Sequence, residues 1–102
     1  MRLLRNAAGV LTSETLTGTS GDFWGVTAAD FDNDGDLDAL ALGYGGNSAF
    51  LRNNGDGSFA VSGLPALASL DGRAVDIDGD GDQDVVAARA TGLTDKVLIN
   101  DG

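Results

Sequence analysis

Short apolar runs alternate with glycine, asparagine and aspartate along the whole chain. Runs of this length, bounded by turn-forming residues, are typical of β-strands and lack the three-to-four-residue spacing of an amphipathic helix. We expect strands at residues 2–5, 24–29, 38–42, 49–52, 58–61, 73–75, 84–88 and 96–99. The pattern therefore predicts an all-β chain.

The connections between these strands carry their own signals. Residues 53–58 read Asn-Asn-Gly-Asp-Gly-Ser, and Asn and Gly tolerate the positive φ angles that tight hairpins require. The single proline, Pro65, falls between two predicted strands, where its missing N–H costs no ladder hydrogen bond. Both features favour antiparallel strands joined by short turns.

The chain repeats itself at a spacing of 47 residues. Leu4-Arg5-Asn6 recurs as Leu51-Arg52-Asn53 and, more loosely, as Leu98-Ile99-Asn100, so that the three asparagines are evenly spaced. We divide the chain into a first repeat at residues 1–53 and a second at 54–102, with about four strands in each. A repeat of this length with four antiparallel strands is the size of one β-propeller blade.

Two blades cannot close a ring, and alone they would leave strand edges and apolar faces exposed. We therefore expect two four-stranded antiparallel blades that form part of a β-propeller completed by homo-oligomerisation. A trimer would give six blades and a tetramer eight. The second repeat lacks an outermost strand, which the segment after Asn6, of this copy or another, could supply. The alternative is that the chain is a fragment, natural or designed, of a longer propeller.

Aspartates alternate with other residues in two nine-residue segments, 30–38 and 76–84, that share the pattern D-x-D-x-D-G-D-x-D. Alternating carboxylates on a tightly turning backbone converge on one point, and the glycine permits the turn. Positions 1, 3, 5 and 9 should give side-chain oxygens, and position 7 its carbonyl. The predicted metal ligands are Asp30, Asp32, Asp34, Asp36 and Asp38 in the first loop, and Asp76, Asp78, Asp80, Asp82 and Asp84 in the second.

Calcium suits these loops best, at about two ions per chain. It takes six to eight oxygen ligands in flexible geometry, whereas magnesium demands a tight octahedron and keeps its waters. Five carboxylates in nine residues repel one another unless a cation lies among them, so binding and folding should be coupled. The alternative is an acidic solvated turn. An EF-hand would need Glu at position 12, where Ala41 and Ala87 stand.

Composition removes several classes of function. The chain of 102 residues has no cysteine and no histidine, which excludes disulfides, Cys/His zinc sites and a histidine-based triad. Its formal net charge of -10 argues against nucleic acid and anionic membranes as partners. No apolar run is long enough to span a membrane, and the first residues do not resemble a secretory signal.

The segment Trp24-Gly25-Val26-Thr27-Ala28-Ala29 before the first loop, together with residues 50–59, resembles FG-GAP/VCBS repeats, the blades of integrin-α-like β-propellers. The resemblance extends over essentially the whole chain, and D-x-D-x-D-G-x-x-D is its most specific part. It implies that each loop joins the first two strands of a blade and holds calcium. The second repeat departs from the pattern, with Gln83 in place of Leu37 and Leu70-Asp71-Gly72 in place of Trp24-Gly25-Val26.

These observations favour a calcium-binding propeller module with a structural or binding role and no catalysis. An alternative is a lectin, with Trp24 or Tyr44 stacking on a sugar, although both aromatics also suit a blade core. A protein ligand is a further option. A glycosidase would need paired carboxylates outside the loops. Glu14 is the single glutamate, and Asp22, Asp71 and Asp95 lie in turn-like contexts. Calcium is plentiful outside cells, so we expect an extracellular or secreted protein.

Overall fold

The computed structural model describes residues 1–19, 21–89 and 92–102, and this part of the chain forms nine strands and no helix. The strands are β1 (Arg2–Ala7), β2 (Val10–Thr15), β3 (Phe23–Ala29), β4 (Asp38–Gly43), β5 (Ser48–Asn53), β6 (Phe59–Leu64), β7 (Ser69–Val75), β8 (Asp84–Arg89) and β9 (Lys96–Leu98). The predicted all-β class is confirmed. Across these residues, no helix has the length and apolar character needed to cross a membrane.

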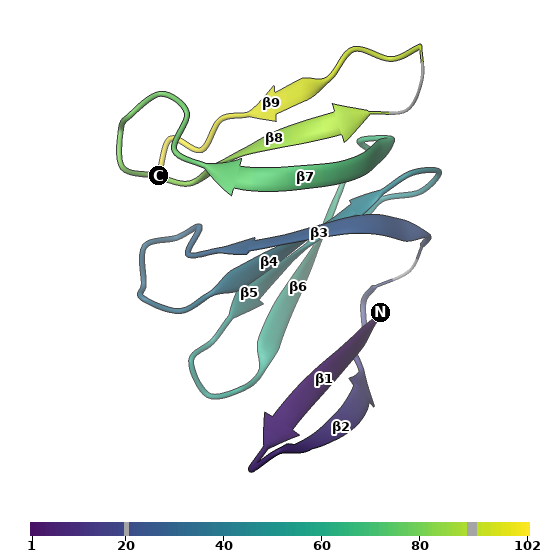
Figure 1. Cartoon of the computed structure of the whole chain (residues 1–102), viewed down its shortest axis with the longest axis vertical. Coiled ribbons are helices and arrows are strands. Elements are labelled where there is room, and N and C mark those ends of the chain that lie inside the picture. Colours follow the sequence, from purple (N-terminus) through teal and green to yellow (C-terminus); the bar gives the residue numbers. More distant parts are fainter. Residues whose placement is uncertain (20, 90–91) are drawn as a thin grey trace.

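The strands form three antiparallel sheets stacked along the longest axis of the molecule (Figure 1). β1 and β2 make a hairpin, β3-β4-β5-β6 a four-stranded sheet, and β7-β8-β9 a three-stranded sheet. We expected two four-stranded blades, and one sheet, β3 to β6, has four strands. This sheet crosses the predicted boundary between the repeats, because β6 follows residue 53. In the described part of the chain, the last sheet has no fourth strand, and the N-terminal hairpin lies at the opposite end of the stack.

The hairpin contains a strand, β2, that the apolar pattern did not predict. Its two-residue turn is Ala8-Gly9, with φ angles of 51° and 85°. Such a turn matches the twist of antiparallel strands, but Ala is an uncommon residue at positive φ. Asn6 Oδ1 accepts a hydrogen bond from the Gly9 backbone N–H at 2.9 Å, which holds the turn where its sequence signal is weak.

The central strand β4 is buried on both faces, and this explains its nearly unbroken apolar sequence. Leu40 and Leu42 face the three-stranded sheet, where they pack with Leu67 and Val85. Ala41 points to the other side, in a second cluster that also contains Met1 and Leu16 from the ends of the hairpin segment. A strand that is covered on both faces has a continuous apolar sequence, because neither face meets water.

The two larger sheets approach closely where β3 lies beside β7 (Figure 1). A Cβ atom on Gly25 would lie 2.8 Å from the Asp71 Cα atom, so glycine is needed there. Two residues further along β3, the Thr27 hydroxyl accepts a hydrogen bond from the Ala74 backbone N–H at 3.1 Å. Small and hydroxyl side chains on β3 thus allow the first strands of the two larger sheets to lie side by side.

Candidate metal centres

Each aspartate-rich loop connects the first two strands of a sheet: residues 30–37 link β3 to β4, and 76–83 link β7 to β8. Two residues in each loop take positive φ, Asn33 and Gly35 in the first and Gly79 and Gly81 in the second. Asn and Gly are the residues that adopt this conformation at least cost. The two loops therefore turn at equivalent positions.

The turns bring three carboxylates of each loop together. Oxygens of Asp30, Asp32 and Asp38 lie within 4.8 Å of one another, and the same is true of the second loop, with Asp76, Asp78 and Asp84. These are positions 1, 3 and 9 of the pattern in both cases. A group of hard oxygen donors of this kind could hold a metal ion, and it matches the preference of calcium for carboxylates.

The ninth-position aspartates are held most firmly. Asp38 is 1% exposed, and its two oxygens accept hydrogen bonds from the backbone N–H groups of Phe31 (3.1 Å) and Asn53 (2.8 Å). Asp84 is equally buried and accepts from Ile77 (2.9 Å) and Asn100 (2.8 Å). The Asn100 and Ile77 N–H groups lower the pKa of Asp84, because they stabilise its charged form. These two aspartates anchor their loops to the sheets.

The first-position aspartates tie each loop to itself. Asp30 accepts from the N–H groups of Asp34 (3.1 Å) and Gly35 (2.9 Å). Asp76 does the same with Gly79 (2.7 Å) and Gly81 (3.0 Å). The turn that gathers the carboxylates is thus stabilised by one of the carboxylates that it gathers.

The predicted ligands at positions 5 and 7 are placed differently. Among the described residues, the grouped carboxylates include neither Asp34 and Asp36 nor Asp80 and Asp82. Oδ1 of each fifth-position aspartate accepts a hydrogen bond from the backbone N–H two residues on, at 3.0 Å in the first loop and 2.9 Å in the second. Their roles as ligands remain predictions.

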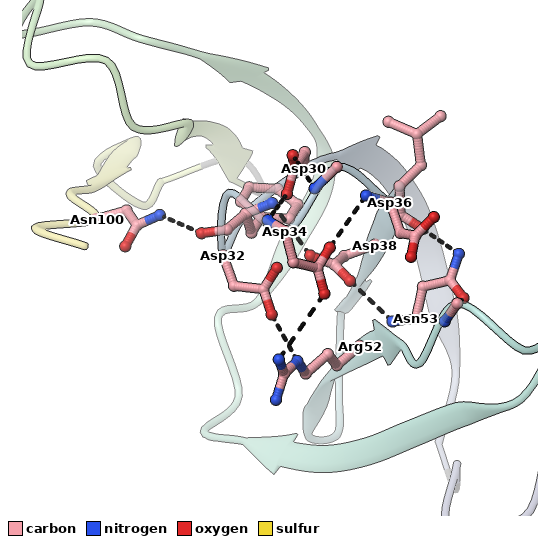
Figure 2. Close-up of polar contacts among 12 residues, drawn as sticks. Asp30, Asp32, Asp34, Asp36, Asp38, Arg52, Asn53 and Asn100 are labelled. Carbon is pink, nitrogen blue, oxygen red and sulfur yellow. Dashed lines mark hydrogen bonds and ion pairs between the residues drawn. The ribbon is translucent and has the colours of Figure 1, made fainter.

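A basic residue that was not predicted to contribute to the site forms ion pairs with aspartates of the first loop (Figure 2). Arg52 on β5 places Nε 2.5 Å from Asp32 Oδ2 and Nη2 3.8 Å from Asp34 Oδ2. Its signal was present in the repeated triplet, where Arg52 precedes Asn53. At the equivalent position of the second loop stands Ile99, which cannot pair with a carboxylate.

The second loop therefore keeps more uncompensated negative charge. Within the described part of the chain, no arginine or lysine forms an ion pair with an aspartate of this loop. Desolvation, followed by the charges of Asp80, Asp84 and Asp76, raises the pKa of Asp78. Like charges at short range disfavour ionisation, and a bound cation would relieve that cost.

The two loops also touch each other. The Asn100 side-chain amide donates to the Phe31 carbonyl of the first loop at 2.8 Å (Figure 2). The same amide donates to the Gln83 carbonyl of the second loop at 3.4 Å. The Asn33 amide donates to the Asp82 carboxylate. A change in the shape of one loop will thus reach the other directly.

Trp24 and Tyr44, the candidate sugar-stacking residues, lie together on the surface. Their ring centroids are 5.4 Å apart, and the side chains are 64% and 45% exposed. Trp24 borders an apolar groove between the hairpin and the four-stranded sheet, which Met1, Leu16 and Phe59 also line. The pair is thus an exposed aromatic surface, whereas a blade core would bury both rings.

Three of the four acids named above as candidates for a glycosidase have polar partners. Glu14 pairs with Arg5 at 3.0 Å, and this arginine lowers the pKa of Glu14. Asp71 pairs with Arg73 at 3.2 Å. Asp95 Oδ1 accepts a hydrogen bond from the Arg89 backbone N–H at 3.0 Å. Each of these three acids thus takes part in a contact within the fold.

Comparison with protein families identifies one match. Residues 1–41 match the family model of the FG-GAP-like repeat, a segment that includes the hairpin, β3 and the whole first loop. The resemblance predicted from the sequence is thus confirmed over these residues. Searches of the curated proteins and of the solved structures found no match.

Proposed function

We propose, on the premise that residues 1–41 form an FG-GAP-like repeat, that the chain is a calcium-binding module of β-propeller type. One observation carries the proposal: the same three carboxylates, at positions 1, 3 and 9, come together in both loops. The module has a structural and binding role without catalysis. It works outside the cell, where calcium is abundant enough to fill such sites.

Calcium is the ion that the loops fit best. Each loop offers carboxylates on a backbone whose glycines allow adjustment, and calcium accepts irregular oxygen cages of six or more ligands. Asp34 and Asp80, which now bond to their own loops, lie close enough in sequence to join the three grouped carboxylates. Binding two ions per chain would offset four formal charges and hold each loop against its sheet.

The exposed apolar surface supports assembly into a ring. Leu4 and Leu11 lie on the same face of the hairpin and are 63% and 65% exposed, although Leu51, the counterpart of Leu4, is 2% exposed. The Cα radius of gyration is 14.0 Å, against about 13 Å for a compact domain of this length. Three or four copies, with six or eight blades, would cover these faces.

Calorimetric titration with calcium tests the metal sites. We expect two ions per chain, and one ion in each of the variants Asp30→Asn and Asp76→Asn. Asp56→Asn is the matched control, because Asp56 lies in a turn outside both loops. There its Oδ1 accepts a hydrogen bond from the Ser58 backbone N–H at 2.9 Å. Two ions in all three variants, or none in the parent chain, would refute the assignment. Light scattering with and without a chelator then tests whether calcium supports assembly.

Carbohydrate binding is a second candidate, and the exposed Trp24–Tyr44 pair favours it. Aromatic rings stack on the apolar faces of sugars, and two exposed rings 5.4 Å apart are an unusual feature of a surface. A glycan array tests this function. Binding that Trp24→Ala abolishes and the exposed-residue control Leu37→Ala preserves would support a lectin, and an array without any binding would end the idea.

A further inference from the structure

The first strand has an unused hydrogen-bonding edge. β1 is the counterpart, at the 47-residue spacing, of β5 and β9. β5 pairs with β4, and β9 pairs with β8, so each lies against the strand that follows an aspartate loop. In the described part of the chain β1 pairs with β2 alone, and its other edge faces no strand. An open edge of this kind is a template for another strand.

The residues on β1 match that missing partner. Arg52 on β5 pairs with two aspartates of the first loop, and the Asn53 backbone N–H donates to Asp38. Arg5 and Asn6 stand at the same two positions on β1. No aspartate loop lies beside them in the described structure, and Arg5 instead pairs with Glu14.

The second loop has the opposite deficiency. Its partner strand β9 is three residues long and β5 is six residues long, although each makes three register pairs with the strand that follows its loop. Ile99 occupies the arginine position, so Asp78 and Asp80 face no guanidinium in the described residues. Among the described residues, the sheet that contains this loop also ends at β9, without the fourth strand that β6 provides to the four-stranded sheet.

We propose that the β1–β2 hairpin of one copy replaces β9 on strand β8 of a second copy. By the register of β8 with β9, Leu4 would lie opposite Val85 and Leu3 opposite Val86. Asn6 N–H would donate to Asp84, and Arg5 would reach Asp78 and Asp80. The second calcium loop is thus completed by an arginine from another chain. This inference rests on the assembly within the proposed function and names the strands that perform it.

The exchange solves four problems at once. It supplies the missing fourth strand as β2, and it covers Leu4 and Leu11. A two-stranded hairpin on its own is marginally stable in water, and here it gains a sheet. The charges are complementary, because the Arg5 guanidinium would lie beside the second aspartate loop, which has no arginine partner among the described residues. The hairpin need not leave its own four-stranded sheet, because the face that packs there, with Leu3 and Arg5, is not the face that exposes Leu4.

Disulfide trapping between single-cysteine variants tests the register, and the chain has no cysteine of its own. Leu3→Cys and Val86→Cys chains are mixed with calcium under mild oxidation. We expect a covalent dimer of the two different chains, at least five times more abundant than with the control mixture Leu11→Cys and Val86→Cys. Leu11 lies on β2, one strand further from β8, beyond the reach of a disulfide. Equal yields in the two mixtures would overturn the proposal.

A second pair of variants tests the arginine. Arg5→Ser should lower the yield of that crosslink several-fold, and Arg2→Ser, on the opposite face of β1, should leave it unchanged. Ile99→Arg should also lower the yield, because β9 would then satisfy its own loop. If the chain binds two calcium ions and forms a multimer but the Leu3–Val86 crosslink does not form, the exchange is wrong and the proposed function stands. If calcium does not bind, the proposed function itself fails.

Discussion

The two repeats present nearly the same loop in two different settings. In both, the first-position aspartate closes the turn, and the ninth-position aspartate accepts two backbone N–H groups. The first loop is balanced by Arg52 and lies on a four-stranded sheet, while the second faces Ile99 and lies on three strands. Loop shape is thus local, whereas charge balance depends on a strand far along the chain.

The outward faces of the two sheets differ as well. Gly25 and Thr27 on β3 allow β7 to pack closely against β3. Their counterparts on β7 are Asp71 and Arg73, which form an exposed ion pair. A strand could not approach β7 as closely as β7 approaches β3. The three-stranded sheet therefore presents a different surface to a neighbouring strand, and the two repeats are not interchangeable.

The largest effect should come from Asp38→Ala, which removes the anchor of the first loop. Two buried backbone donors, on Phe31 and Asn53, would lose their acceptor, and each such loss costs about 1–3 kcal/mol. We expect the free energy of unfolding without calcium to fall by about 3 kcal/mol. Urea denaturation followed by circular dichroism in the presence of a chelator measures it.

Asp34→Ala is the control for this experiment. Asp34 lies in the same loop, but it is exposed and accepts one hydrogen bond within the loop. Its loss should change the stability by less than about 1 kcal/mol. An equal fall for both variants would show that Asp38 contributes only charge to the loop.

Gly25→Ala should be the next largest change. The new methyl group would meet the Asp71 Cα atom at 2.8 Å and the Leu70 carbonyl oxygen at 3.1 Å, so the two sheets would have to move apart. Overpacking of this kind costs about 1–3 kcal/mol. Gly63→Ala on β6 is the matched control, because nothing lies within 4 Å of its Cβ position. Thermal unfolding that is the same in both variants would contradict the close approach of β3 and β7.

Sequence alone predicted the parts of this structure that are local. The loops, and eight of the nine strands in the described residues, follow from alternating aspartates and short apolar runs. β2 was missed because Ala8-Gly9 is a weak turn signal. The pairing of Arg52 with the first loop, and the Asn100 contact with Phe31, were missed because they join residues 20 and 69 positions apart. Such contacts depend on how sheets stack, and periodicity does not encode stacking.

Exchanging the residues at the arginine position tests whether Arg52 explains the difference between the loops. Arg52→Ile should raise the calcium affinity of the first loop, and Ile99→Arg should lower that of the second, since a nearby positive charge repels the ion. A change of about 1 kcal/mol corresponds to roughly fivefold in affinity. Calorimetry on chains that retain one loop, with Asp76→Asn or Asp30→Asn, would measure each. Affinities that do not move would mean that Arg52 leaves its aspartates before calcium enters.

The smallest effect, and the most specific, concerns Asp78. Its pKa is raised by desolvation and by neighbouring aspartates, so its charge destabilises the calcium-free fold above that pKa, and the cost disappears as the pH falls through it. Asp78→Asn should therefore raise the melting temperature without calcium at pH 7, by an amount that shrinks towards zero below about pH 4. Asp32→Asn should give no such gain, because Arg52 already balances Asp32. Calorimetric scans from pH 7 to 3.5 with a chelator, at low ionic strength, measure both variants, and equal gains would show that the arginine does not distinguish the two loops.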